Sequence, residues 1–201
     1  MITTTLPVME AFYTIQGEGA HQGRAAYFIR LGGCDVGCHW CDVKESWDAA
    51  QHPLCTVDEI VDEAARHPAR IAVITGGAPL MHNLKKLCAA LHRQGFKIHV
   101  ETSGAHPLQG AVDWVCLSPK KFKAPRPEIY QWVDELKVVV YNRSDFVWAE
   151  QFAEQMPPGC QLFLQPEWSV SEKMLPLMVD YVKEHPRWRI SLQIHKFMQI
   201  P

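Results

Sequence analysis

Short apolar runs alternate with amphipathic segments along almost the whole of this 201-residue chain. Apolar runs bounded by turn residues indicate strands. They occur at 25–31, 71–75, 97–102, 114–118, 135–140, 161–165 and 188–193. Because strands that alternate with helices form parallel sheets with helical crossovers, the pattern predicts an α/β fold.

Helical patterns fill several of the intervals between these strands. Thr56 and Glu59 have the spacing of a capping box, which marks the start of a helix. A second helix is expected to stop at Gly95, and two more are expected near 145–155 and 171–184. A closed eight-fold barrel usually needs about 250 residues. We therefore expect a single domain, 1–201, that folds as a partial, trimmed parallel β/α barrel of about six strands.

Polar motifs follow five of the expected strands at the point where each strand ends. They are the cysteine-containing stretch 33–42, Thr75-Gly76-Gly77, Glu101-Thr102-Ser103-Gly104, Ser118-Pro119-Lys120 and Gln165-Pro166-Glu167-Trp168. In parallel α/β folds the active site gathers at the carboxyl ends of the strands. The sequence therefore predicts one site on this rim.

Cys34, Cys38 and Cys41 have the spacing C-x3-C-x2-C. Three thiolates on one loop can hold three irons of a 4Fe-4S cluster, which leaves the fourth iron open for chemistry. Zinc is the alternative, but zinc sites usually have four ligands, and no second Cys or His pair stands at a suitable spacing. We expect a cluster, and a non-catalytic iron–sulfur or zinc-binding module remains the alternative from another class.

Arg30 lies inside an apolar run, where a guanidinium needs an anion. The anion is either a structural carboxylate or a carboxylate of the substrate, and we favour the substrate. The glycines of Thr75-Gly76-Gly77 allow a ligand to approach the backbone closely, although a plain strand-to-helix turn has the same residues.

Charge and cysteine usage narrow the class of protein. The formal net charge is -2 and there is no Lys/Arg-rich run, so we expect no direct binding of nucleic acid. No apolar run approaches the roughly 20 residues that span a membrane. The first ten residues do not have the pattern of a signal peptide. Seven cysteines, an odd number, do not form a disulfide framework, which favours a reducing cytoplasm.

Taken together, the motifs resemble those of the radical S-adenosylmethionine (SAM) superfamily and, within it, the 7-carboxy-7-deazaguanine synthase family. The resemblance covers nearly the whole chain in order. It is carried by Ile15-Gln16-Gly17-Glu18-Gly19, Arg30, 34–42, Thr75-Gly76-Gly77, Glu101-Thr102-Ser103-Gly104, Ser118-Pro119-Lys120, Glu135-Leu136-Lys137, Gln165-Pro166, and His195-Lys196 with Pro201.

This resemblance implies a lyase that uses a 4Fe-4S cluster and SAM to convert 6-carboxy-5,6,7,8-tetrahydropterin to 7-carboxy-7-deazaguanine. Ammonia is released, and the product leads to 7-deazapurines such as queuosine. The family also implies a homodimer and an electron donor such as flavodoxin. An activase that makes a radical on a partner protein is the nearer alternative. Such a protein needs an open docking groove, whereas Arg30 and the apolar C-terminal stretch favour a closed pocket for a small molecule.

The resemblance also implies roles for individual residues. The cluster ligands are Cys34, Cys38 and Cys41. The SAM site is lined by Trp40, Asp42, Gly77, Ser103, Ser118, Pro119, Lys120, Gln165, Pro166, Glu167 and Trp168. The pterin pocket is formed by the backbone of Ile15, Gln16 and Gly17 together with Arg30, Thr75, His195 and the carboxylate of Pro201.

Two positions depart from the family pattern. Ala78 stands where an acidic residue usually accepts hydrogen bonds from the SAM ammonium, so we expect weakened SAM binding. Val43 stands where a hydroxyl usually ligates Mg2+, and valine has no oxygen to offer. The magnesium site is therefore left open, with Asp42, Glu45 or Ser46 as substitutes.

Overall fold

A computed structural model of the chain describes residues 4–201, and its strands form a single nine-stranded sheet in the order β3-β1-β2-β4-β5-β6-β7-β8-β9. The strands are β1 (Thr5–Ile15), β2 (Ala25–Leu31), β3 (Leu54–Thr56), β4 (Ile71–Gly76), β5 (Lys97–Thr102), β6 (Trp114–Leu117), β7 (Glu135–Val140), β8 (Gln161–Pro166) and β9 (Trp188–Ile190). The α-helices are α1 (Val57–Ala65), α2 (Lys85–Arg93), α3 (Ser144–Ala153), α4 (Ser171–Glu184) and α5 (Ile194–Met198). The two ends of this strand order do not pair with each other, which confirms the partial barrel.

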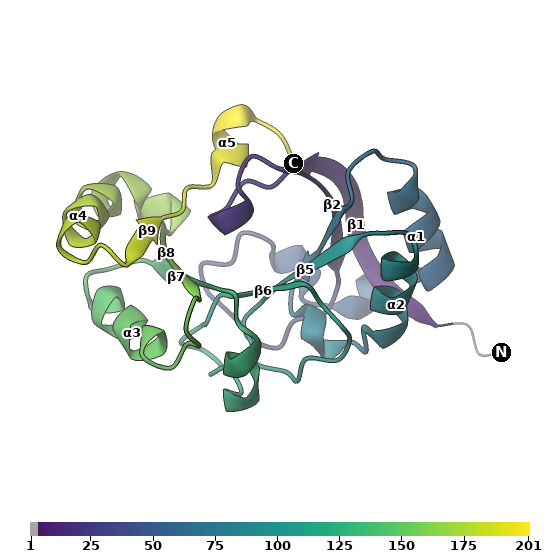
Figure 1. Cartoon of the computed structure of the whole chain (residues 1–201), viewed down its shortest axis with the longest axis horizontal. Helices are drawn as coiled ribbons and strands as arrows, with labels where there is room; N and C mark the ends of the chain where they lie inside the picture. The colour runs from purple at the N-terminus through teal and green to yellow at the C-terminus, as the bar shows by residue number, and fades with distance from the viewer. Residues whose placement is uncertain (1–3) are drawn as a thin grey trace.

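Parallel pairing runs without interruption from β2 through β4 to β9. Figure 1 shows α1 and α2 outside one end of the curved sheet and α3 and α4 outside the other end, with the strands around the middle. Buried residues of all four helices belong to one core cluster with the strands. This arrangement brings the carboxyl ends of the parallel strands to a common rim. None of the helices between residues 4 and 201 has the length and apolar character needed to cross a bilayer.

Apolar helix faces packed on the sheet make the main core. In α1 the buried residues are Val57, Ile60, Val61 and Ala64, which repeat at helical spacing. The expected capping box is present at the start of α1, with the Glu59 amide donating to Thr56 Oγ1 at 3.1 Å and the Thr56 amide donating to Glu59 Oε2 at 2.7 Å.

The expectation of about six strands was too low. The seven apolar runs are all strands, and β1 and β3, which were missed, bring the sheet to nine. Both are antiparallel, β1 to β2 and β3 to β1. The sequence of β1 contains Pro7 and shifts register between Val8 and Glu10, so its buried residues do not alternate along the strand. The last expected strand, 188–193, ends at Ile190, after which the chain turns into α5.

Candidate active site

A cavity of about 390 Å³ lies at the carboxyl ends of the parallel strands. Its walls come from the turn after β1, the loop after β2, the ends of β4 to β8, and α5. This volume lies within the range of small-molecule sites. Every residue expected at the site lines the cavity except Pro119.

The cysteine loop, residues 34–42, forms one end of the cavity. Cys38 is 7% exposed and packs with Val36 and Ala105, while Cys34 and Cys41 are half-buried. The glycine motif lies directly behind this loop. A Cβ atom on Gly77 would lie 2.6 Å from Cβ of Cys34, so only glycine allows the strand end to approach the loop this closely.

The donor set of the loop fits a multi-iron cluster. Within residues 4–201, no three His, Cys, Asp or Glu side chains are close enough together to hold a single metal ion. Cluster ligands bind different irons and so lie farther apart than the ligands of one ion, and thiolates are the ligands that iron–sulfur clusters use. Burial raises the pKa of Cys38 to about 11, so cluster binding must remove a proton from this thiol. The arrangement therefore fits a cluster and does not fit the zinc alternative.

The residues expected to bind SAM extend from this loop toward β6 and β8. Lys120 Nζ donates to Ser118 Oγ at 2.5 Å and lies 5.6 Å from the ring centre of Trp40. Burial lowers the pKa of Lys120 to about 8. The buried hydroxyl of Ser103 has no hydrogen-bond partner among residues 4–201. A buried hydroxyl that lines a cavity and lacks a partner fits a polar ligand there.

Another part of the cavity wall is formed by Arg30, Thr75 and His195. Arg30 Nε donates to Glu10 Oε1 at 2.6 Å, so a structural carboxylate takes one side of the guanidinium. The ring of His195 lies against the turn after β1, where a Cβ on Gly17 would lie 2.1 Å from His195 Nδ1. Burial lowers the pKa of His195, which favours the neutral ring near pH 7.

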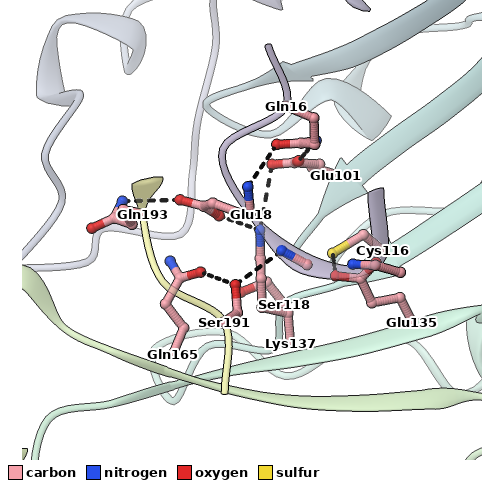
Figure 2. A network of polar contacts seen from close by, with 12 residues as sticks. Gln16, Glu18, Glu101, Cys116, Ser118, Glu135, Lys137, Gln165, Ser191 and Gln193 are labelled. Carbon is pink, nitrogen blue, oxygen red and sulfur yellow. Dashed lines mark hydrogen bonds and ion pairs between the residues drawn. The ribbon is translucent and has the colours of Figure 1, made fainter. Parts of the chain in front are cut away.

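Four charged residues that were given no role also line this cavity, Lys196 of α5 and three that lie together. The three are Glu18, Glu101 and Lys137, and Figure 2 shows them meeting in one polar network. The sequence held a signal for Lys137, because a lysine inside the apolar run of β7 needs buried carboxylate partners. The partners themselves cannot be read from the sequence.

Of the two residues that depart from the family pattern, Val43 lines the cavity and Ala78 does not. Ala78 is 2% exposed, and its amide donates to the Gly33 carbonyl at 2.8 Å. Ser46, one of the expected substitutes, is buried and donates its hydroxyl to the Val43 carbonyl at 2.7 Å. Asp42 is therefore the expected substitute that reaches the cavity.

Known proteins resemble the chain along most of its length. The sequence profile of the Radical SAM superfamily matches residues 28–123. The chain is 56% identical over 196 residues to 7-carboxy-7-deazaguanine synthase of Flavobacterium psychrophilum, covering 98% of this chain and 93% of the relative. It is 48% identical over 200 residues to the protein of the same name from Synechocystis sp., covering 100% of this chain and 96% of the relative. The crystal structure of QueE from Escherichia coli superposes with a TM-score of 0.85 at 28% identity, covering 94% of this chain and 93% of that one.

Proposed function

Because this chain belongs to the 7-carboxy-7-deazaguanine synthase family of radical SAM enzymes, we propose that the cavity on the strand rim is where it carries out the ring contraction of that family. The enzyme is a lyase that converts 6-carboxy-5,6,7,8-tetrahydropterin to 7-carboxy-7-deazaguanine and releases ammonia. The observation that carries the placement is that the cysteine loop, the glycine motif and Arg30 all line one cavity.

In this proposal Cys34, Cys38 and Cys41 hold the 4Fe-4S cluster, and SAM lies between the cysteine loop and the ends of β6 and β8. When bound, the cluster supplies the electron that cleaves SAM and so starts the radical chemistry. The Ser103 hydroxyl is free to bind SAM. Trp168, whose ring centre lies 4.6 Å from Lys196 Nζ, covers the outer side of this region.

Arg30 binds the substrate carboxylate in this proposal. Within the described part of the chain the hydrogen bonding of its side chain is confined to Nε, so the terminal nitrogens remain for a second carboxylate. Thr75, His195 and the backbone of 15–17 surround the remainder of the pterin, and Pro201 lines the same cavity. Arg30 would thus set the orientation of the substrate relative to the cysteine loop.

In this proposal α5 and its neighbours cover part of the cavity. α5 lies near the turn after β1 (Figure 1), its residues His195 and Lys196 line the cavity, and the Ile194 amide donates to the Gly17 carbonyl at 3.0 Å. Phe197 packs its ring edge on Trp168, with 5.8 Å between ring centres. A closed pocket suits the chemistry, because a reactive radical must meet only the substrate carbon held beside it.

We further propose the features that the family implies but that residues 4–201 alone do not test. These are a homodimer of single-domain chains (residues 1–201) in the cytoplasm, an electron donor such as flavodoxin, and a weak Mg2+ site at Asp42 that is not required for turnover. The partly exposed Cys34 and Cys41 support the electron donor, because they make the cysteine loop accessible from outside. The seven cysteines, all free, support a reducing compartment.

The test is an anaerobic reaction followed by mass spectrometry. The mixture contains the reconstituted protein, a strong chemical reductant, SAM and 6-carboxytetrahydropterin. We expect 7-carboxy-7-deazaguanine to appear only when all components are present. Omitting SAM and omitting reductant in parallel reactions provides the controls, and iron and sulfide analysis should give about four of each per chain.

Two results would contradict the proposal. If 5′-deoxyadenosine forms without the deazaguanine product, the radical chemistry is retained but the substrate is wrong, and the protein-activase alternative gains support. If neither compound forms with protein that contains a full cluster, the assigned SAM site is wrong.

A further inference from the structure

Two motifs that carry the family resemblance have no role in the function described above. They are Glu101-Thr102-Ser103-Gly104, apart from Ser103, and Glu135-Leu136-Lys137. The structure joins them through Lys137, a residue of β7 whose side chain is 5% exposed. Lys137 Nζ pairs with Glu18 and lies 3.7 Å from Glu101 Oε2 (Figure 2).

The charge of Lys137 is maintained by these two carboxylates. Burial by itself would lower the pKa of the ammonium, but Glu101 and Glu18 outweigh burial and hold that pKa well above its ordinary value. In the same way, burial opposes ionisation of Glu18, yet Lys137 lowers the pKa of Glu18 to about 2. The group is therefore a buried ion cluster at the cavity wall.

Each carboxylate connects Lys137 to a different segment of the wall. Glu101 Oε1 accepts a hydrogen bond from Gln16 Nε2 at 2.9 Å, on the turn of residues 16–19 that follows β1. Glu18 Oε1 accepts one from Gln193 Nε2 at 2.9 Å, in the segment of residues 191–195 that leads into α5. We call the first segment the entry turn and the second the closing segment.

The entry turn and the closing segment are also bonded directly to each other. The Gly19 amide donates to Ser191 Oγ at 2.9 Å, and the Ile194 amide donates to the Gly17 carbonyl at 3.0 Å. Neither segment is part of the sheet. The Ser191 amide of the closing segment donates to the Leu164 carbonyl of β8 at 2.8 Å. Side chains from the strands make the other connections to the sheet, and Lys137 of β7 and Glu101 of β5 reach Glu18 and Gln16 of the entry turn.

We propose that Lys137 is a positioning residue for the pterin, because its ammonium holds the entry turn and the closing segment where they form the substrate end of the cavity. The inference rests on the proposed function, since Gln16, Gly17 and His195 of these segments belong to the proposed pterin pocket. Without the ammonium, the carboxylates of Glu18 and Glu101 would face each other in a buried place and repel. The wall would then open at the pterin end. Among residues 4–201 the ion pairs of Lys137 are to Glu18 and Glu101, and none is to the cysteine loop.

The experiment compares Lys137→Met, Lys137→Arg and wild type, with Glu150→Gln as a matched control. Glu150 also centres a polar network, accepting from Trp188 Nε1 at 2.8 Å and from Tyr181 Oη at 2.6 Å, but it does not line the cavity. For each protein we would measure iron content, KM for the pterin, KM for SAM, and hydrogen exchange of the Gly19 and Ile194 amides.

Lys137→Met should raise the KM for the pterin by about 10- to 100-fold, because truncating one member of a buried pair leaves the other charges uncompensated. The KM for SAM and the iron content should stay within about twofold, since the contacts of Lys137 are to the pterin end. Exchange of the Gly19 and Ile194 amides should become faster. Lys137→Arg should recover most of the loss because it keeps the cation. Glu150→Gln should leave both KM values unchanged.

Three results would overturn the proposal. In the first, the KM for the pterin is unchanged in Lys137→Met. In the second, the KM for SAM rises as much as that for the pterin, which indicates general damage. In the third, Lys137→Arg is as impaired as Lys137→Met. Because arginine keeps the charge but does not give up a proton, this result would indicate that Lys137 acts by transferring a proton. Failure of the proposed function gives a different result, because wild type then forms no product from this pterin. Exchange at Gly19 and Ile194 still decides the positioning role in that case.

Discussion

The two ends of the cavity are built in different ways. The cysteine loop contains no helix or strand between residues 34 and 42, and its backbone is held by few bonds, such as the Cys34 amide to the Trp47 carbonyl at 3.0 Å. Its side-chain contacts are those of Asp35, which accepts from His106 and Lys123 at 2.9 and 2.5 Å, and of Asp42, whose Oδ2 lies 3.5 Å from Lys196 Nζ of α5. The pterin end is instead cross-linked by the buried charges around Lys137.

This difference indicates which part of the site needs its bound cofactor to adopt an ordered conformation. Metal binding and local folding are coupled wherever the protein ligands are not held rigidly in advance. The cysteine loop fits that case, because few protein contacts hold it. The pterin end is preorganised by the chain's own charges, as a site that must orient a substrate requires. Mutations in the two ends should therefore have separable effects.

The largest effect should come from Cys38→Ser, which removes one cluster ligand. We expect loss of bound iron and a fall in product formation of at least about 1000-fold, since the radical step depends on the cluster. Iron analysis and mass spectrometry measure the two. Cys160→Ser is the control, because Cys160 lies away from the cavity. If the Gly19 and Ile194 amides also exchange faster in Cys38→Ser, the two ends are not independent.

Arg30→Gln should affect the pterin end alone. Losing the charge-assisted pair with the substrate carboxylate should raise the KM for the pterin by about 10- to 100-fold. Iron content and the KM for SAM should not change. Arg66→Gln is the matched control, since Arg66 is exposed and pairs with Glu63 at the end of α1. An unchanged KM for the pterin in Arg30→Gln would mean that Glu10 takes the whole of the guanidinium.

Acid should weaken the pterin end through Glu18. Its pKa is about 2 in the folded protein and 4.5 ordinarily, so its stabilising contribution is present above pH 4.5 and is lost as the pH falls toward 2. By pH 3 the loss should be about 2 kcal/mol. Urea unfolding of the cluster-free protein at pH 7, 5 and 3 measures it. The stability difference between wild type and Glu18→Gln should shrink over this range, whereas that for the exposed Glu184→Gln should not.

Ala78→Glu should change SAM binding without changing pterin binding. A carboxylate next to Gly77 would restore an acceptor for the SAM ammonium and strengthen SAM binding by about tenfold. Equilibrium dialysis with SAM measures the change, and the KM for the pterin should stay constant. Ala78 is 2% exposed, so thermal unfolding must be followed to separate any cost of overpacking. Unchanged SAM affinity in a stable variant would show that position 78 does not face the ammonium.

The smallest effect should be that of Mg2+. Val43 lines the cavity without an oxygen, so removing Mg2+ with EDTA and adding it back should change wild-type turnover by less than about threefold. Val43→Thr should gain a stronger response to Mg2+. Iron content must be checked after EDTA treatment. A wild-type enzyme that is inactive in EDTA and restored by Mg2+ would show that Asp42 or the substrate is a sufficient ligand.

Strands whose residues are mostly buried could be predicted from the sequence, and strands that are half-exposed could not. The parallel strands are buried on both faces and read as continuous apolar runs, as in β4, where 72–74 are fully buried. All seven of them were found, although β9, with an exposed Arg189, is not buried on both faces. β1 and β3 are half-exposed and antiparallel, and β1 contains Pro7, so neither gives such a run.

Prediction of the site succeeded where residues are close in the chain and failed where they meet through the fold. The cysteine trio and the glycine motif each lie within a few residues, and their positions after strands place them on the rim. Lys137 and Glu18 are 119 residues apart, and nothing in the local sequence of either names the other. The sequence shows that a buried lysine needs a partner, but only the fold identifies it.

The contact between Glu18 and Gln193 joins residues 175 positions apart. During synthesis the entry turn leaves the ribosome early, because chains emerge and begin to fold from the N-terminus. Its contacts to the closing segment can form only after nearly the whole chain has been made. The cysteine loop closes on Trp47 and the glycine motif and is anchored by His106 and Lys123, all of which precede the closing segment by more than 60 residues. The metal end of the site can therefore be complete in a nascent chain long before the substrate end, so assembly of the cluster and first access of the substrate are separated in time.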